Sequence, residues 1–244
     1  MPLKMMCVVA HPDDECFAFG GALALAAREG VETYVLCLTD GQAATNRGAA
    51  ATGADLGQIR RKEFAESCDV LEVAKHELLG YQDGQLEFAS VHEVAGVIVE
   101  RIRQWKPDVV LTFGTDGALN IHADHTMVSC FTSSAFHWAA RTKRYPEQKL
   151  QPHIAKRLYH LSTSFVLPDR EPLLPAPWNV TLDIAAVLQQ KMDAFRKHTS
   201  QLPVFDKVKP FWDTYGSTEH YVLAAASAPQ PAQHAISFFS DIEE

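Results

Sequence analysis

The sequence predicts a three-layer α/β fold in which a mostly parallel sheet is covered by helices on both faces. Short, continuously apolar segments such as residues 5–10 and 33–39 are typical of strands buried on both sides. They alternate with longer segments of helical pattern, such as residues 17–29 and 91–105, as expected of parallel strands joined by helices. With 244 residues, 47% of them hydrophobic, the chain can bury a large core.

The first elements have clear boundaries. The β-branched residues in 5–10 favour a buried strand. Residues 17–29 are rich in Ala and Leu and end at Gly30, a common stop for a helix. Residues 33–39 form the second apolar strand, and an Asp-Gly pair ends it.

The alternation continues to residue 145 and gives this part a Rossmann-like character. The polar, Gly- and Ala-rich stretch at 42–53 is long for a compact domain, so we expect a functional or mobile loop there. The remaining elements expected in this part are helices at 56–70, 91–105 and 122–140 and strands at 77–81 and 109–113.

The remainder of the chain is less regular because five prolines fall between residues 152 and 177. We expect residues 1–244 to form a single domain, in which 146–244 make an irregular C-terminal part over the strand ends. The elements expected there are strands at 157–162 and 178–183, a helix at 184–198 and a loosely held end from residue 224.

Charge and composition exclude several classes of partner. The formal net charge of −8 disfavours nucleic-acid binding and docking on anionic lipid. No apolar run approaches the roughly 20 residues that a bilayer-spanning helix needs, and the N-terminal run is too short for a signal peptide. Five scattered cysteines without a C-x-x-C pair suit free thiols in a reducing compartment. We therefore expect a cytoplasmic protein without nucleic-acid partners or membrane insertion.

The most informative segment is His11-Pro12-Asp13-Asp14-Glu15, directly after the first predicted strand. In open α/β sheets, ligands bind beyond the carboxyl ends of strands. Adjacent carboxylates repel one another there, and a divalent cation would relieve that repulsion. His11 offers a nitrogen ligand and Asp14 an oxygen ligand. The alternative is an acidic helix start that complements the helix dipole, which accounts for Glu15 but not for His11.

A second group, His122-Ala123-Asp124-His125, follows the strand predicted at 109–113. In the commonest doubly wound sheets this strand lies beside the first one, so both groups would meet in one crevice. A His-x-x-His pair at a helix start places both rings on one face. By itself such a pair is a weak indication, since two exposed histidines fit equally well.

Together the two groups fit a catalytic zinc site, which has three protein ligands and an open position for water. His11, Asp14 and one histidine of the second group would supply the ligands. Asp13 could then take a proton from water. The remaining histidine could hydrogen-bond or protonate the reacting group, and Asp124 could orient a histidine through its other ring nitrogen.

These residues resemble the LmbE-like, or PIG-L, family of zinc-dependent N-acetylglucosaminyl deacetylases, which includes the deacetylases of mycothiol and bacillithiol biosynthesis. The sequence departs from the family pattern at Ala123, usually proline, and at Ile121, usually glycine. Both departures bear on the shape of the pocket. Further matches extend to residue 201: Thr39-Asp40-Gly41, Arg60 with Glu63, Asp83-Gly84, and a late pattern of Lys191, Ala194, His198, Ser200 and Gln201.

The resemblance implies a role for each matching residue. His11, Asp14 and His125 would bind one Zn²⁺ per chain, with Fe²⁺ as the alternative metal. Asp13 would be the general base. His122 would stabilise the oxyanion and could donate a proton to the leaving amine.

The expected reaction is removal of an N-acetyl group from an N-acetylglucosamine-type sugar or conjugate, a small-molecule partner. Arg47, Arg60 and Asp83 could bind its hydroxyls or an anionic aglycone, or else be surface charges or structural ion pairs. Two other functions stay open: a zinc amidase acting on a non-sugar N-acyl substrate, and a metal- or ligand-binding protein without turnover. Family members are often oligomers, so the resemblance also leaves a homo-oligomer open.

Overall fold

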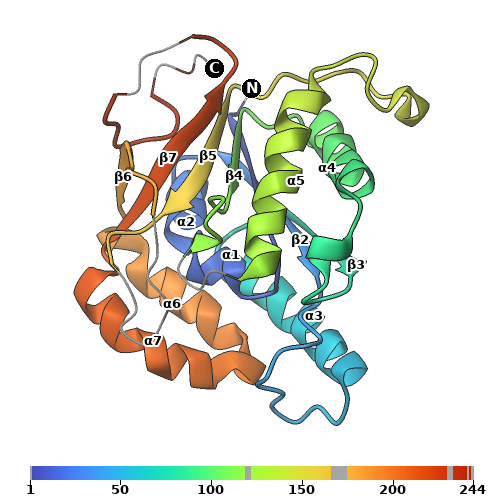
Figure 1. The fold of residues 1–244 in the computed structure, drawn as a ribbon. Coiled ribbons are helices and arrows are strands. Elements are labelled where there is room, and N and C mark those ends of the chain that lie inside the picture. Colours follow the sequence, from blue (N-terminus) through green and yellow to red (C-terminus); the bar gives the residue numbers. More distant parts are fainter. Residues whose placement is uncertain (1, 119–121, 166–174, 230–232, 241, 243–244) are drawn as a thin grey trace.

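The computed structural model is built on a seven-stranded sheet (Figure 1) and describes residues 2–118, 122–165, 175–229, 233–240 and 242. The strands are β1 (Lys4–Val9), β2 (Glu32–Thr39), β3 (Lys75–Tyr81), β4 (Val109–Thr112), β5 (Arg157–Ser162), β6 (Val180–Asp183) and β7 (Thr218–Ala226). They lie in the order β3-β2-β1-β4-β5-β7-β6. Strands β1 to β5 are parallel, whereas β7 is antiparallel to both of its neighbours.

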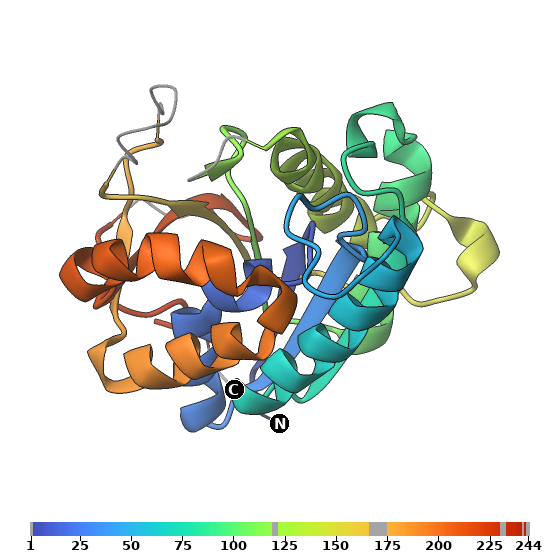
Figure 2. The same cartoon turned by 90° about the horizontal axis from the view of Figure 1, so that it is seen from below.

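Helices cover both faces of this sheet, which confirms the predicted fold class (Figures 1 and 2). One face carries α4 (Val91–Trp105) and α5 (Ala123–Ala139). The other carries α2 (Gly20–Arg28), α3 (Gly53–Val70) and α6 (Leu188–Lys197). The short α1 (Asp14–Phe17) lies at the carboxyl end of β1, and α7 (Leu202–Tyr215) follows α6. Short 3₁₀ helices occur at Leu86–Phe88, Pro146–Gln148, Ala185–Val187 and Thr199–Gln201.

The core is centred on β1, where every side chain from Met5 to Val9 is fully buried. Met5 pairs with Thr33 of β2 on one side and with Val109 of β4 on the other. The apolar runs are therefore continuous because both faces of these strands lie under helices and away from water. The pairing of β1 with β4 confirms the predicted neighbours and places the switch in strand order between them.

Several boundaries differ from the sequence prediction, and each difference has a local cause. The helix predicted at 17–29 is two helices, because the carboxylate of Glu219 accepts hydrogen bonds from the backbone N–H groups of Gly21 (2.8 Å) and Ala22 (2.9 Å) and so caps a new helix start. Helix α3 begins three residues early because Thr52 and Asp55 form a capping box.

The C-terminal part contributes more regular structure than expected. It adds β5, β6 and β7 to the sheet, and neither α7 nor β7 was predicted. The end expected to be loose from residue 224 still belongs to β7, whose residues Ala225 and Ala226 pair with β5. The sequence analysis missed this strand because it begins with the polar residues Thr218, Glu219 and His220 and its last residues merge into an Ala- and Pro-rich end.

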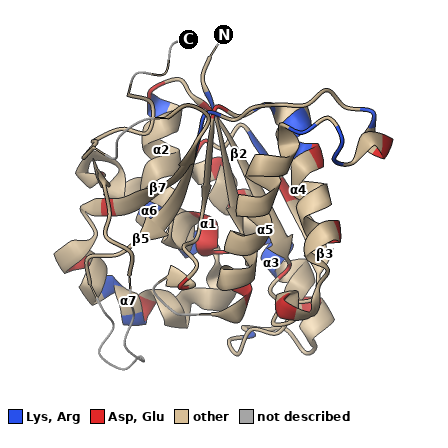
Figure 3. Cartoon of the chain, turned by 45° about the horizontal axis from the view of Figure 1, so that its top comes forward, with Lys and Arg blue, Asp and Glu red and all other residues tan. Residues whose placement is uncertain are grey.

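Charge is distributed unevenly over the described residues. Most charged positions lie toward the periphery, whereas the acidic residues of α1 lie in the middle of the molecule (Figure 3). This buried negative charge marks the place where the strand-end groups meet. None of the helices in the described part of the chain is both long enough and apolar enough to cross a membrane.

Candidate active site

The two groups predicted at the strand ends come together in the structure. His11 and Asp14 follow β1, whereas His122 caps α5 and His125 lies in its first turn. The ring centroid of His11 lies 4.8 Å from that of His122 and 5.3 Å from that of His125. The doubly wound strand order therefore brings two distant segments into one crevice, as expected.

The residues His11, Asp14 and His125 form a group that could hold a metal ion, since each offers a ligand atom within 4.8 Å of the others. The Nδ1 atom of His125 donates to the carbonyl of Gly117 at 3.1 Å. In the neutral ring, the buried Nε2 atom then carries a lone pair that a metal could use. It lies 3.2 Å from Oδ1 of Asp14. A lone pair and a carboxylate oxygen at that separation suit a shared cation.

The other nitrogen of His11 is held by carboxylates. Its Nε2 atom lies 3.0 Å from Oδ1 of Asp83 and 3.2 Å from Oδ2 of Asp124, whereas Nδ1 faces Oδ2 of Asp14 at 3.6 Å. Burial opposes a charge on His11, but these carboxylates raise its pKa well above the usual value. The surroundings of His11 thus favour positive charge, and carboxylates at Nε2 leave Nδ1 as the atom for a metal.

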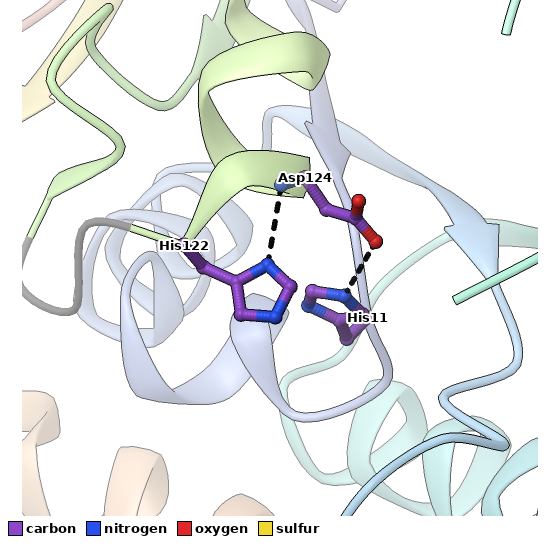
Figure 4. Close-up of side chains that lie close together, drawn as sticks. All are labelled: His11, His122 and Asp124. Atoms are coloured by element: carbon purple, nitrogen blue, oxygen red, sulfur yellow. Dashed lines mark hydrogen bonds and ion pairs between the residues drawn. The ribbon is translucent and has the colours of Figure 1, made fainter. Parts of the chain in front are cut away.

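A second group, His11, His122 and Asp124, also has its ligand atoms within 4.8 Å (Figure 4). Its members are occupied by hydrogen bonds. Nδ1 of His122 accepts from the backbone N–H of Asp124 at 3.2 Å. The carboxylate of Asp124 accepts from the N–H groups of Gly84 (2.7 Å) and Leu86 (3.1 Å). The group containing His125 is therefore the better candidate for a metal.

The cap position also decides the protonation of His122. A neutral ring whose Nδ1 accepts a hydrogen bond carries its proton on Nε2. Burial, followed by the proximity of His11 and His125, lowers the pKa of His122 and so favours this neutral form. The side chain is a hydrogen-bond donor poised beside the candidate metal group.

Asp13 adopts an unusual backbone conformation for a residue other than glycine, with φ at 106°. Two contacts hold it. Its N–H donates to Oε2 of Glu15 at 2.9 Å, and its Oδ2 accepts from the guanidinium of Arg60 at 2.8 Å. Burial raises the pKa of Asp13 to about 6, although Arg60 acts in the opposite direction. Strained residues of this kind cluster at functional sites.

The residues predicted to bind substrate lie in different surroundings. Arg60 is buried and also donates to the carbonyls of Pro12 and Gly41, so its position fits the structural ion-pair alternative. Asp83 lies beside His11, as described above, and accepts from the N–H of Ala43 at 2.9 Å. Arg47 is exposed and is absent from the described lining of the cavity.

The two departures from the family pattern have separate outcomes. Ala123 is the first residue of α5, where proline is common, and the helix starts there under the cap of His122. Ile121 lies outside the described residues.

One supporting cluster was not predicted from the sequence. Oε1 of Glu15 accepts from Nε2 of His198 at 2.7 Å and from Oγ of Ser67 at 2.6 Å, and all three side chains are buried. Burial disfavours both charges, but their mutual attraction lowers the pKa of Glu15 and raises that of His198. The late family pattern contained His198 but gave no sign of its partner.

A cavity of about 520 Å³ joins these residues, a volume typical of small-molecule sites. Its lining includes the side chains to which the sequence assigned reacting or metal-binding roles, namely His11, Asp13, Asp14, His122 and His125.

The fold and this site define an α/β protein with a candidate metal centre in the crevice between β1 and β4. The family profile of PIG-L, described as GlcNAc-PI de-N-acetylase, matches residues 6–136, and the chain belongs to this family.

Similar proteins include enzymes that act on amides. The chain is 32% identical over 166 residues to mycothiol S-conjugate amidase of Streptomyces coelicolor, an alignment that covers 60% of this chain and 56% of the relative. It is 29% identical to the probable N-acetyl-alpha-D-glucosaminyl L-malate deacetylase 2 of Bacillus cereus, which covers 82% of this chain and 84% of the relative.

Solved structures give the same fold. N,N'-diacetylchitobiose deacetylase from Pyrococcus horikoshii superimposes with a TM-score of 0.75 at 24% identity, over 89% of this chain and 82% of that one. The conserved protein TT1542 from Thermus thermophilus has a TM-score of 0.73 at 26% identity, over 94% of this chain and 98% of that one.

Proposed function

We propose that this chain is a metal-dependent hydrolase that removes the N-acetyl group from an N-acetylglucosamine-type sugar or conjugate. The observation that carries the proposal is the buried Nε2 of His125, which faces Oδ1 of Asp14 at 3.2 Å in a cavity that Asp13 and His122 also line. Membership of the PIG-L family and the deacetylase names of several relatives support the reaction.

We assign one Zn²⁺ per chain to His11, Asp14 and His125, with Fe²⁺ as the alternative. Nitrogen and carboxylate ligands in a set of three are the donors that catalytic zinc uses. The metal would supply Lewis acidity for an amide carbonyl and for water. Asp124 and Asp83 hold His11 through Nε2 and so fix the ring for this task.

Asp13 is the proposed general base. Arg60 occupies Oδ2, so Oδ1 is the oxygen that we assign to the attacking water. Asp13 accepts the proton of this water as its oxygen adds to the amide carbon. When the carbon–nitrogen bond breaks, the same carboxyl group returns the proton to the nitrogen. The products are acetic acid and an amine, which ionise to acetate and the ammonium form.

His122 is the proposed donor to the oxyanion. Its Nε2–H would hydrogen-bond the oxygen on which negative charge develops. Because Nδ1 accepts from the backbone of Asp124, full protonation of the ring would break the helix cap. This contact favours a neutral donor over a histidine that cycles through the imidazolium form.

The remaining expectations follow from the sequence. We treat residues 1–244 as one domain, in which 146–244 complete the site, and we propose a cytoplasmic location. A homo-oligomer also stays a prediction, which sedimentation of the purified protein would test.

Release of acetate from a panel of N-acetylated sugars by the zinc-loaded protein tests the function. Hydrolysis confined to N-acyl amides that are not sugars would favour the broader amidase. A protein that binds zinc with high affinity but releases no acetate or other acid would favour the binding protein without turnover.

His122 and His125, at the start of α5, provide a matched pair of variants. H122A should keep about one equivalent of metal by elemental analysis, while kcat falls about 10²- to 10³-fold, the usual effect of losing one oxyanion donor. H125A should lose the metal. The reverse result would exchange the roles of these two residues.

A further inference from the structure

One wall of the cavity is apolar although the reaction has no evident use for it. It consists of Phe17 of α1, Leu161 of β5, Phe195 of α6, and Val204 and Val208 of α7. The two valines lie four residues apart and so share one face of their helix. Phe17 and Val204 are only partly buried. Apolar surface in a ligand cavity favours binding, because the free energy falls when a ligand covers it and removes it from water.

The apolar wall is backed by packed aromatic rings. The ring centroid of Phe17 lies 5.4 Å from that of Trp212. Phe195 lies 5.6 Å from Phe205 and 5.7 Å from Trp212. These contacts fix α1, α6 and α7 against one another, so the wall is formed before any ligand binds.

Polar groups that could bind a sugar also line the cavity, and one of them, Gln201, is the N-cap of α7. Thr45 and Asn46 come from the loop after β2, and Gln201 donates to the carbonyl of Asn46 at 3.0 Å. Burying a hydroxyl group without a hydrogen-bond partner costs free energy. A sugar ring is therefore suited to this polar lining and poorly suited to the valines of α7.

Other apolar side chains lie beside the candidate metal group, where they could surround the acetyl methyl group of a substrate. Phe113 stacks on His125 with ring centroids 3.9 Å apart, and Ala118 also lines the cavity. The α7 wall is therefore left for another part of the substrate.

Building on the proposed function, we propose that the preferred substrate carries an apolar alkyl or aryl aglycone, which binds against Phe17, Phe195, Val204 and Val208. The chemical class is thus an N-acetylglucosamine-type sugar linked to an apolar group. The specificity-determining residues would lie in the C-terminal part of the chain, on α6 and α7.

Two glycosides that differ only in the aglycone test this subsite. The zinc-loaded enzyme is given the methyl and the hexyl glycoside of N-acetylglucosamine with the same anomeric configuration. We expect kcat/KM to be at least about tenfold higher for the hexyl compound, mainly through KM, because buried methylenes add binding that is the same in ground and transition states.

Substitutions on one helix locate the effect. Val204→Asn should lower the hexyl-to-methyl ratio about tenfold. Leu202→Asn changes an exposed apolar residue of the same helix that is not part of the described cavity lining, and it should leave the ratio unchanged. An equal ratio in all three proteins, or no preference in the parent enzyme, would overturn the proposal. The proposal would also be overturned if the enzyme preferred an N-hexanoyl sugar over the N-acetyl sugar and did not distinguish the two aglycones.

Binding separates this proposal from the proposed function. The hexyl and methyl glycosides of glucosamine lack the acetyl group and are not turned over, so calorimetry measures their affinities directly. Tighter binding of the hexyl compound, lost in Val204→Asn, supports the subsite even if no acetamide is hydrolysed. Equal affinities contradict the subsite even if deacetylation occurs.

Discussion

The two parts of the chain contribute to the site in different ways. Among the described residues, every side chain with a proposed reacting or metal-binding role lies before residue 145, at the ends of β1 and β4. The C-terminal part instead holds these segments in place. His198 binds Glu15, Ser200 donates to Glu63 at 2.7 Å, and Gln201 donates to the carbonyl of Asn46. The proposed chemistry thus depends on two short segments of the first part of the chain, whereas their support comes from the C-terminal part.

The support is built from buried charge. Lys191 donates to Glu219 at 2.6 Å, and both side chains are buried. Glu219 also accepts from the first N–H groups of α2, where the helix dipole favours a negative charge. Removing one partner of such a pair leaves an uncompensated charge, which costs about 3–5 kcal/mol. Glu219 therefore couples the C-terminal part to the start of α2.

The largest expected effect comes from the strand-end group itself. Asp14→Asn keeps the shape of the side chain but removes the charge that faces His125. Metal affinity should fall by at least about 100-fold, more than the loss of an outer partner usually costs. Activity should be almost lost and should return partly at high zinc. Elemental analysis and kcat/KM at graded zinc concentrations measure both effects.

Substitution of the neighbouring Asp13 should reduce activity without removing the metal. Asp13→Asn cannot accept a proton, so kcat/KM should fall about 10²- to 10⁴-fold while the metal content stays near one equivalent. Added zinc should restore nothing. Equal loss of metal in both variants, or an active Asp13→Asn enzyme, would refute the separation of their roles. The pair shows whether neighbouring carboxylates are distinguished by direction alone.

A smaller effect is expected from the long-range support. Glu15→Gln removes the charge that pairs with His198 and should lower kcat about tenfold by loosening Asp13, a modest misplacement of a reacting group. Metal content should be unchanged. The matched control is Glu66→Gln, which removes an exposed α3–α6 ion pair with Lys197 and should change little.

The same pair should give stability a characteristic pH dependence. Because the pKa of Glu15 is lowered, its ionised carboxylate stabilises the fold at pH values above 4.5, its usual pKa. This stabilisation is lost as the pH falls through the lowered pKa. Because the pKa of His198 is raised, its protonated ring stabilises the fold at pH values below 6.5, its usual pKa. This stabilisation is lost as the pH rises through the raised pKa. Urea unfolding of the metal-free protein should therefore show the parent more stable than Glu15→Gln by about 1–3 kcal/mol near pH 5.5. If the difference in unfolding free energy between the two proteins does not become smaller at higher pH, Glu15 and His198 are not coupled in this way.

Much of the fold could be read from apolar runs. Strands β1, β2, β4 and β5 were predicted within one residue at each end, because strands buried on both faces must be continuously apolar. Helix α4 was predicted at its observed bounds, where a cap at Ser90 precedes an apolar face. By contrast, α7 and β7 have mixed faces and were missed. Their positions depend on partners far away in the sequence.

The sequence by itself determined which residue types stand at the ends of β1 and β4. It also predicted that these ends are neighbours, because the commonest doubly wound sheets place the two strands side by side. Only the tertiary structure shows that Nε2 of His125 faces Asp14 while Nδ1 of His122 accepts a backbone hydrogen bond, the difference on which their proposed roles rest. It also decided that Arg60 holds Asp13 and that Arg47 is exposed. Hydrogen bonding and burial depend on distances between atoms of residues far apart in the chain, and no local pattern contains those distances.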